Sequence, residues 1–406
     1  MTKVSNINPG GTYDIIQTVF KLSMMSNLAN NITGETASQI QAQLGADIAV
    51  GLKSAAVQIG TWTTVWGPAV FQYDNSGVSD NAMYAAYNAT ANCYVVCVAA
   101  TNMNSKYDIN ELDLNVSTMV PFPMGITPAH SRHPATQNFG NVSAGAALGV
   151  TNLLNMQDPT THDSLQTFLN STAISNPGAT LIFTGHSLGG SLSPTLATWL
   201  YPSVPAGWSA IYVVPTAGPA TGDQGFCNNF AEVFPPCTID GVNPAYGVFN
   251  ELIWNEYDVV PHAWTNIMNV QPYEAQNDIL WDPTLKFGIC VNCQSVYGEL
   301  TDKNGTAPGV YAIINHIYQL VTPGETYAKL TNLMFTPSSE PSGMTSVDQF
   351  EQTAYQEHVP EYATFFGVSL TGGEAKVGVA LMTRCRRSKP DPTRDRCKNR
   401  RLEPAW

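Results

Sequence analysis

Long hydrophobic runs are missing from this sequence, and so is the apolar core of a signal peptide. No segment approaches the roughly 18 consecutive apolar residues that a membrane-spanning helix requires. The opening residues, MTKVSNINPGG, do not contain the apolar stretch that a secretory signal places near its N-terminus. We therefore expect no transmembrane segment, and any secretion signal must have been removed or must lie elsewhere.

Basic residues are scarce over most of the chain. Only 18 of the 406 residues are Lys or Arg, and nine of these lie between Arg384 and Arg401. Residues 1–383 therefore carry 9 basic and 28 acidic side chains, a net charge of −19. Nucleic acid is a poor partner for such a body, because its phosphates would be repelled. The basic tail, residues 381–406, is expected to be disordered or foreign to the natural protein; the alternative is an arm that binds anions.

The cysteines do not have the spacing of a zinc site. One CxxC motif occurs at 290–293, without a second motif or a nearby pair of histidines to complete four ligands. Cys93 and Cys97 lie in one strand pattern, which separates their Cα atoms by about 13 Å, beyond the roughly 7 Å that a disulfide allows. We expect these two to be free, buried thiols. Local disulfides are expected for two other pairs, Cys227–Cys237 and Cys290–Cys293.

Apolar periodicity predicts alternating helices and strands. The predicted helices cover residues 13–31, 37–55, 144–156 and 163–173, with another from about 188. The predicted strands cover residues 92–99, 180–184, 209–218 and 246–255. Such alternation is typical of an α/β protein with a mainly parallel central sheet flanked by helices.

The stretch ATLIFTGHSLGG, residues 179–190, places a serine between glycines where a strand pattern gives way to a helical one. A serine hydroxyl acts as a nucleophile only beside a base and near amide donors. A tight strand-to-helix turn meets both needs, but it requires the small residues Gly185 and Gly189 because backbone segments approach closely there. The first N–H groups of the helix then face the developing negative charge. The pattern indicates that Ser187 is a nucleophile; the alternative is an ordinary tight turn.

The sequence resembles the class 3 lipases, the fungal-type triacylglycerol lipase family of α/β-hydrolases. The resemblance rests on four blocks in the family's order between about residues 80 and 370: CYVVCVAATN, GHSLGG, PTAGPATGDQGFCNNF and NEYDVVPH. It implies an α/β-hydrolase domain over residues 1–380 and ester hydrolysis without a metal or an organic cofactor. Ala99 and Ala100 depart from the Arg-Gly that usually precedes the family's oxyanion residue.

Three histidines follow the proposed nucleophile and could be its base. In α/β-hydrolases the acid and then the histidine follow the serine. His262 lies four residues after Asp258, too near it to come from a separate loop. His316 falls in an apolar helical pattern, where a buried structural histidine is typical. His358 precedes an aromatic stretch, as the family's histidine does, so it is the predicted base, with His316 as the alternative.

Asp258 is the predicted acid, because it follows an apolar strand pattern and the site of such folds gathers at the carboxyl ends of strands. Glu256 is the alternative. The predicted reaction is acyl transfer, in which a base takes the proton of Ser187 and Asp258 orients that base. The N–H groups of Thr101 and Leu188 are predicted to form the oxyanion hole.

The resemblance also implies a lid after the oxyanion residue. Residues 102–127 mix apolar and polar positions as a lid would; an ordinary surface loop is the alternative. The long distance between Asp258 and His358 predicts an insertion at about 265–345. A secreted triacylglycerol lipase that acts on neutral lipid at an interface is expected. The alternatives are a short-chain or aryl-ester (feruloyl-type) esterase, a phospholipase A1, and a non-catalytic binding protein of the same fold.

Overall fold

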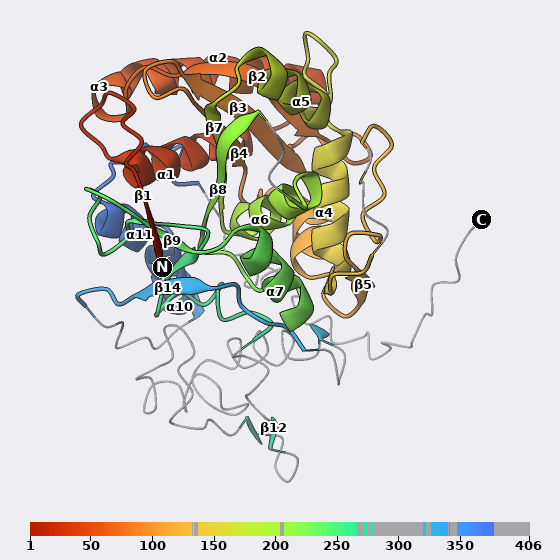
Figure 1. Cartoon of the computed structure of the whole chain (residues 1–406). Helices are drawn as coiled ribbons and strands as arrows, with labels where there is room; N and C mark the ends of the chain where they lie inside the picture. The colour runs from red at the N-terminus through yellow and green to blue at the C-terminus, as the bar shows by residue number, and fades with distance from the viewer. Residues whose placement is uncertain are drawn as a thin grey trace.

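A seven-stranded sheet forms the centre of the protein. The computed structural model describes residues 1–131, 133, 137–203, 207–265, 272–273, 278–279, 320–321, 326–339, 341 and 347–376. The strand order is β14-β11-β8-β7-β4-β3-β2. Their bounds are β2 Thr63–Phe71, β3 Asn81–Asn88, β4 Cys93–Val98, β7 Ala179–His186, β8 Trp208–Thr216, β11 Leu252–Asn255 and β14 Asn332–Phe335. The five strands from β14 to β4 are parallel, whereas β3 and β2 join as antiparallel strands. The predicted α/β-hydrolase fold with a mainly parallel sheet is confirmed (Figure 1).

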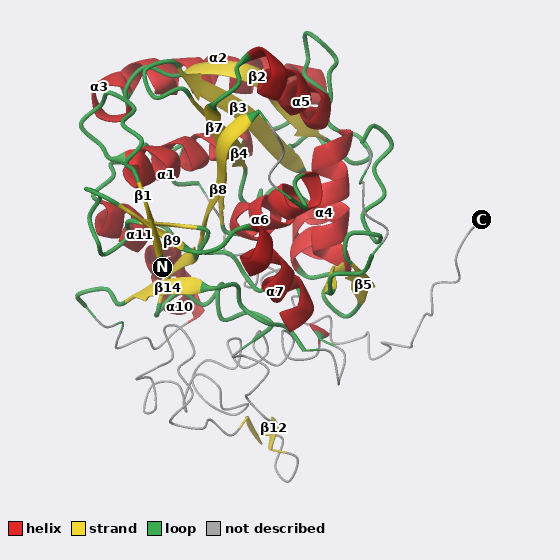
Figure 2. Ribbon diagram, in the orientation of Figure 1, coloured by secondary structure: helices red, strands yellow, loops and turns green. Residues whose placement is uncertain are grey.

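Helices cover both faces of this sheet (Figure 2). On one face lie α1 Ile15–Met25 and α2 Ala37–Ser54; on the other lie α4 Ala144–Asn155, α5 Leu165–Ser175, α6 Leu188–Leu200 and α7 Gln224–Val233. The side chains of β4 alternate between the two cores: Cys93, Val95 and Cys97 pack with α1, and Tyr94, Val96 and Val98 pack with α4 and α6. Both faces of β4 are therefore apolar, as expected of a strand that lies between two helical layers.

The remaining described elements are short except for α10. They are β1 Thr2–Val4, η1 Ser26–Asn31, α3 Ala56–Ile59, η2 Asp108–Asp113, β5 Met119–Pro121, β6 Asn141–Ser143, β9 Cys237–Ile239, β10 Val248–Phe249, β12 Pro272–Tyr273, β13 Asp278–Ile279, α10 Val347–His358 and α11 Pro360–Phe366. The helices begin at side-chain caps where the sequence offers them. Asp14 accepts the N–H of Gln17, whose side chain in turn accepts the N–H of Asp14, so α1 starts with a capping box.

The predicted strand at 246–255 is two strands in different sheets. β10 joins β9, whereas β11 joins the central sheet. Asn250 lies between them with φ 65°, a left-handed conformation that breaks a continuous strand. The side chain of Asn250 also accepts the N–H of Val213 in β8 at 2.8 Å, which fixes the break in place.

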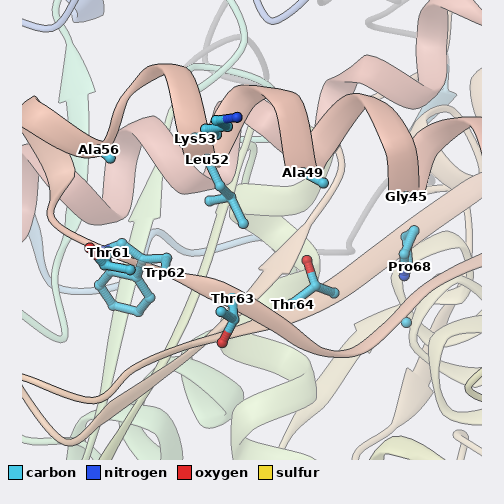
Figure 3. A pocket seen from close by; sticks show the side chains of 11 residues that line it. Gly45, Ala49, Leu52, Lys53, Ala56, Thr61, Trp62, Thr63, Thr64 and Pro68 are labelled. Carbon is cyan, nitrogen blue, oxygen red and sulfur yellow. The ribbon is translucent and has the colours of Figure 1, made fainter.

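β2 is an edge strand, and side chains bond two of its outward N–H groups. The N–H of Gly67 donates to Oδ2 of Asp158 at 2.7 Å, and the N–H of Val70 donates to Oε1 of Gln41 at 3.1 Å. Beside this edge, α2 and β2 flank a groove of about 550 Å³ (Figure 3). Trp62 is among the residues that line it.

The predicted disulfide between Cys227 and Cys237 is wrong: both thiols are free. Cys227 lies on α7 in the core on one face of the sheet, and Cys237 lies on β9 in the core on the other face. Cys93 and Cys97 are free and buried, as predicted. The pair Cys290–Cys293 lies outside the described residues.

No helix among the described residues is long and apolar enough to cross a membrane. The predicted tail, residues 381–406, lies outside the described residues, as does most of the predicted insertion at 265–345. The domain limits therefore stay predictions.

Candidate functional site

Ser187 occupies the turn between β7 and α6. Its backbone has φ 58° and ψ −124°, which a residue with a side chain rarely adopts, and the residue is 3% exposed. The N–H of Ser187 donates to the carbonyl oxygen of Thr216, the last residue of the neighbouring strand β8, at 3.0 Å. A strained serine at a strand-to-helix turn is the geometry of a nucleophile elbow.

The glycines on either side of Ser187 are required by the close approach of the backbone. A Cβ atom on Gly185 would lie 2.3 Å from the carbonyl carbon of Gly189. A Cβ atom on Gly189 would lie 2.3 Å from the carbonyl oxygen of Val98, at the end of β4. The turn can therefore form without displacing the backbone only where both positions lack a side chain.

His358 and Asp258 form a buried hydrogen-bonded pair. Nδ1 of His358 lies 2.7 Å from Oδ2 of Asp258, and both residues are 0% exposed. The carboxylate accepts two further bonds, from the hydroxyl of Tyr362 at 2.9 Å and from the N–H of Val260 at 3.0 Å. Because Nδ1 faces an acceptor, it carries a proton, and in the neutral ring the lone pair lies on Nε2. Among the described residues, Nε2 has no hydrogen-bond partner.

The alternatives for base and acid have other partners. Nε2 of His262 lies 2.9 Å from the carbonyl oxygen of Glu256, and burial lowers the pKa of His262 to about 3. The carboxylate of Glu256 accepts a hydrogen bond from the hydroxyl of Thr336 at 2.6 Å. His316 lies outside the described residues.

Thr101 and Leu188, the predicted oxyanion residues, both adjoin the elbow. Leu188 is the first residue of α6, where helical N–H groups lack a partner within the helix. Thr101 follows β4 and lines a pocket together with Ser187. Asn30 donates to the carbonyl oxygen of Thr101 at 3.2 Å, and the hydroxyl of Thr101 donates to Asp113 at 2.9 Å. Thr101 is thus held through both its backbone and its side chain.

Asp113 is a site residue that the sequence analysis did not identify. It lies at the end of η2, a π-helical turn within the predicted lid, and it lines the same pocket as Ser187. Burial raises the pKa of its carboxyl group to about 7, although the hydrogen bond from Thr101 acts in the opposite direction. The signal available in the sequence was a carboxylate within the predicted lid, the segment that follows the predicted oxyanion residue.

The pocket at Ser187 is small, with a volume of about 20 Å³. Its remaining wall is apolar and comes from the loop after Asp258, with Val260, Ala263 and Trp264, together with Pro219. A water molecule occupies about this much space, so an acyl substrate can enter only when part of the wall moves.

No cluster of three metal-ligating side chains occurs among the residues that the structure describes. The site instead consists of a serine at a strained turn, a buried histidine–carboxylate pair and helical N–H groups. This arrangement can support nucleophilic acyl transfer.

Comparisons with known proteins show a family model and a fold that this chain resembles. Residues 116–267 match the family model described as Lipase (class 3). The solved structure of M37 lipase is 23% identical to this chain, covers 87% of it and 94% of its own length, and superposes with a TM-score of 0.59. LIP2 lipase of Yarrowia lipolytica is 16% identical; the match covers 60% of this chain and 72% of that chain, with a TM-score of 0.41. A triacylglycerol lipase of Penicillium expansum is 12% identical; the match covers 63% of this chain and 75% of that chain, with a TM-score of 0.35. A search of curated proteins finds no match.

Proposed function

We propose that the chain is a serine ester hydrolase of the class 3 lipase family, whose model matches residues 116–267, and that it hydrolyses neutral acylglycerols through an acyl-enzyme on Ser187. The observation that supports this best is the buried His358–Asp258 pair at 2.7 Å, whose outer nitrogen Nε2 has no partner among the described residues. Such a nitrogen is available to take a proton from the nucleophile.

The proposed reaction has two halves. The hydroxyl oxygen of Ser187 attacks the ester carbonyl carbon, and its proton passes to Nε2 of His358. The tetrahedral intermediate collapses when that proton passes to the leaving alcohol, which leaves an acyl ester on Ser187. Water then attacks the acyl ester, with His358 again as base, and the carboxylic acid departs. Asp258 stabilises the imidazolium that forms in each half.

The N–H groups of Leu188 and Thr101 are proposed to bind the oxyanion of both intermediates. For Leu188, the support is its place at the N-terminus of α6, where the helix dipole favours negative charge. For Thr101, the support is the pair of hydrogen bonds to Asn30 and Asp113 that hold this residue beside the Ser187 pocket. Donors that are fixed in advance need no reorganisation during the reaction.

Neutral lipids are proposed as substrates for two reasons. The apolar wall over Ser187 suits an acyl chain, and the net charge of −19 on residues 1–383 would disfavour anionic interfaces. A lid function for residues 102–127 and secretion of the protein stay predictions.

Purified protein and the Ser187→Ala variant would test the proposal with a fluorophosphonate probe and with p-nitrophenyl esters of increasing chain length. We expect the probe to label the native protein alone, and hydrolysis to extend to long acyl chains and to emulsified triglyceride. Hydrolysis restricted to short or aryl esters would identify an esterase instead. Absence of both labelling and hydrolysis would favour a non-catalytic binding protein.

A further inference from the structure

His186 lies directly before Ser187, and both of its ring nitrogens have partners. The residue is 0% exposed. Nδ1 lies 2.9 Å from the hydroxyl oxygen of Thr216, and Nε2 lies 2.8 Å from the backbone carbonyl oxygen of His358. The second contact joins residues 172 positions apart in the sequence. A single side chain therefore connects the nucleophile turn to the backbone of the residue that carries the proposed base.

The partners determine which nitrogen of His186 carries the proton. A carbonyl oxygen can only accept, so Nε2 must donate to His358. Burial and the neighbouring His358 lower the pKa of His186 well below its usual value, so the ring is neutral and Nδ1 is an acceptor. The hydroxyl of Thr216 must then donate to Nδ1, although the carbonyl oxygen of Gly185 lies within 3.3 Å of it. The carbonyl of His358 thus fixes the tautomer, and the hydroxyl of Thr216 completes the hydrogen bonds of the ring.

The backbone of Thr216 also contacts the elements that carry the proposed nucleophile and the proposed acid. Its carbonyl oxygen accepts the N–H of Ser187 at 3.0 Å. Its backbone pairs with Ile253 of β11, the strand that leads to Asp258. The end of β8 is therefore the place where the elements that carry the nucleophile, base and acid meet.

His358 needs such support because it is the last residue of α10. The final carbonyl groups of a helix have no partner within it. His186 bonds the carbonyl of His358, and Asn255 bonds the preceding carbonyl, that of Glu357, at 2.9 Å. With the backbone held by His186 and Nδ1 held by Asp258, the direction of Nε2 is determined. The ring of His186 also lies 4.9 Å from that of His358 and 5.1 Å from that of Tyr362, centroid to centroid.

We propose that His186, whose ring is held between Thr216 and the carbonyl of His358, is a positioning residue for His358. This inference rests on the proposed function, because it assigns His186 a role in aiming the base. Both ring nitrogens of His186 are bonded, one to Thr216 and one to the carbonyl of His358, so its role is exerted through the base. A misplacement of the base by about 1 Å can lower the rate about a hundredfold, so the predicted effect falls on kcat.

His186→Leu and His186→Gln form the decisive pair. Leucine fills much of the same volume without hydrogen bonds, whereas the glutamine amide can donate to the carbonyl of His358 and accept from Thr216. We expect His186→Leu to lower kcat for p-nitrophenyl butyrate by about 10- to 100-fold with KM nearly unchanged, and His186→Gln to recover most of that loss. A second pair, Thr216→Val and Thr216→Ser, should show a smaller loss for valine and recovery for serine.

Urea unfolding of each variant separates positioning from folding. If His186→Leu does not fold, the Thr216 pair decides by the same comparison. Wild-type kcat in folded His186→Leu, or equal losses in the leucine and glutamine variants, would overturn the inference while the proposed function stands. A wild-type protein that neither reacts with fluorophosphonate nor hydrolyses esters would instead overturn the proposed function, and the inference with it.

Discussion

Substitution of Gly189 by alanine should destabilise the protein and disturb its nucleophile at once. The added Cβ atom would lie 2.3 Å from the carbonyl oxygen of Val98 and 3.0 Å from that of Ala99. Ordinary contacts of a Cβ atom begin near 3.4 Å, so α6 and β4 must separate by about 1 Å. Both elements are buried on every side, and overpacking of this kind costs about 1–3 kcal/mol or more. Because Leu188 and Ser187 lie at the start of α6, the same shift moves the oxyanion donor and the nucleophile.

Urea unfolding and fluorophosphonate labelling would measure the two effects separately. Gly372→Ala is the matched control, because a Cβ atom there has no neighbour within 4 Å and the residue lies outside the site. We expect Gly189→Ala to lower the free energy of unfolding by about 3 kcal/mol, with an unchanged dependence on urea, and to slow labelling of Ser187. The control should match the native protein in both assays. Native stability and a native labelling rate in Gly189→Ala would refute the packing argument.

Three further changes test the site. Ser187→Ala should lower kcat about a million-fold while urea unfolding stays native, and residual activity of a tenth would indicate another nucleophile. Tyr362→Phe removes a donor to Asp258 and leaves the N–H of Asn255 without its acceptor. We expect the free energy of unfolding to fall by about 1–3 kcal/mol and the hydrolysis of p-nitrophenyl butyrate to slow. An unchanged kcat would contradict the role of this hydroxyl. The pKa of Asp113 rises from 3.8 to about 7 on folding, so its stabilising contribution is full below about pH 4 and is lost as the pH rises through 7. Asp113→Asn should therefore flatten the fall in unfolding free energy between about pH 4 and pH 7, and an equally steep fall would contradict the shift.

The buried parallel strands could be predicted from the sequence because their composition is nearly uniform. β4, β7 and β8 lie between two helical layers, and each is a run of apolar or β-branched residues. The antiparallel strands β2 and β3 were missed. Gly67 and Pro68 interrupt the first, where the register shifts, and alanines fill much of the second. Neither strand has the pattern that local reasoning uses.

The candidate site, too, could be predicted from the sequence only in part. Ser187 could be proposed as the nucleophile because its turn imposes local demands on the neighbouring glycines. Asp258 and His358 could be proposed because their order follows that of a known family. The roles of His186 and Tyr362 could not be predicted, because they depend on contacts between residues more than a hundred positions apart. The disulfide between Cys227 and Cys237 was a wrong prediction for a related reason: short separation in sequence does not tell which face of a sheet each residue meets.

The hydrogen bonds that Asp158 and Gln41 make to β2 bear on the tendency of the protein to aggregate in concentrated solution. An edge strand with unpaired N–H groups is a template on which another chain can add a strand, the first step of aggregation. Here the N–H groups of Gly67 and Val70 are already taken by side chains of the same chain. Loss of Asp158 or Gln41 would expose them. The consequence would appear as turbidity or oligomers in concentrated solution before any change in the chemistry at Ser187.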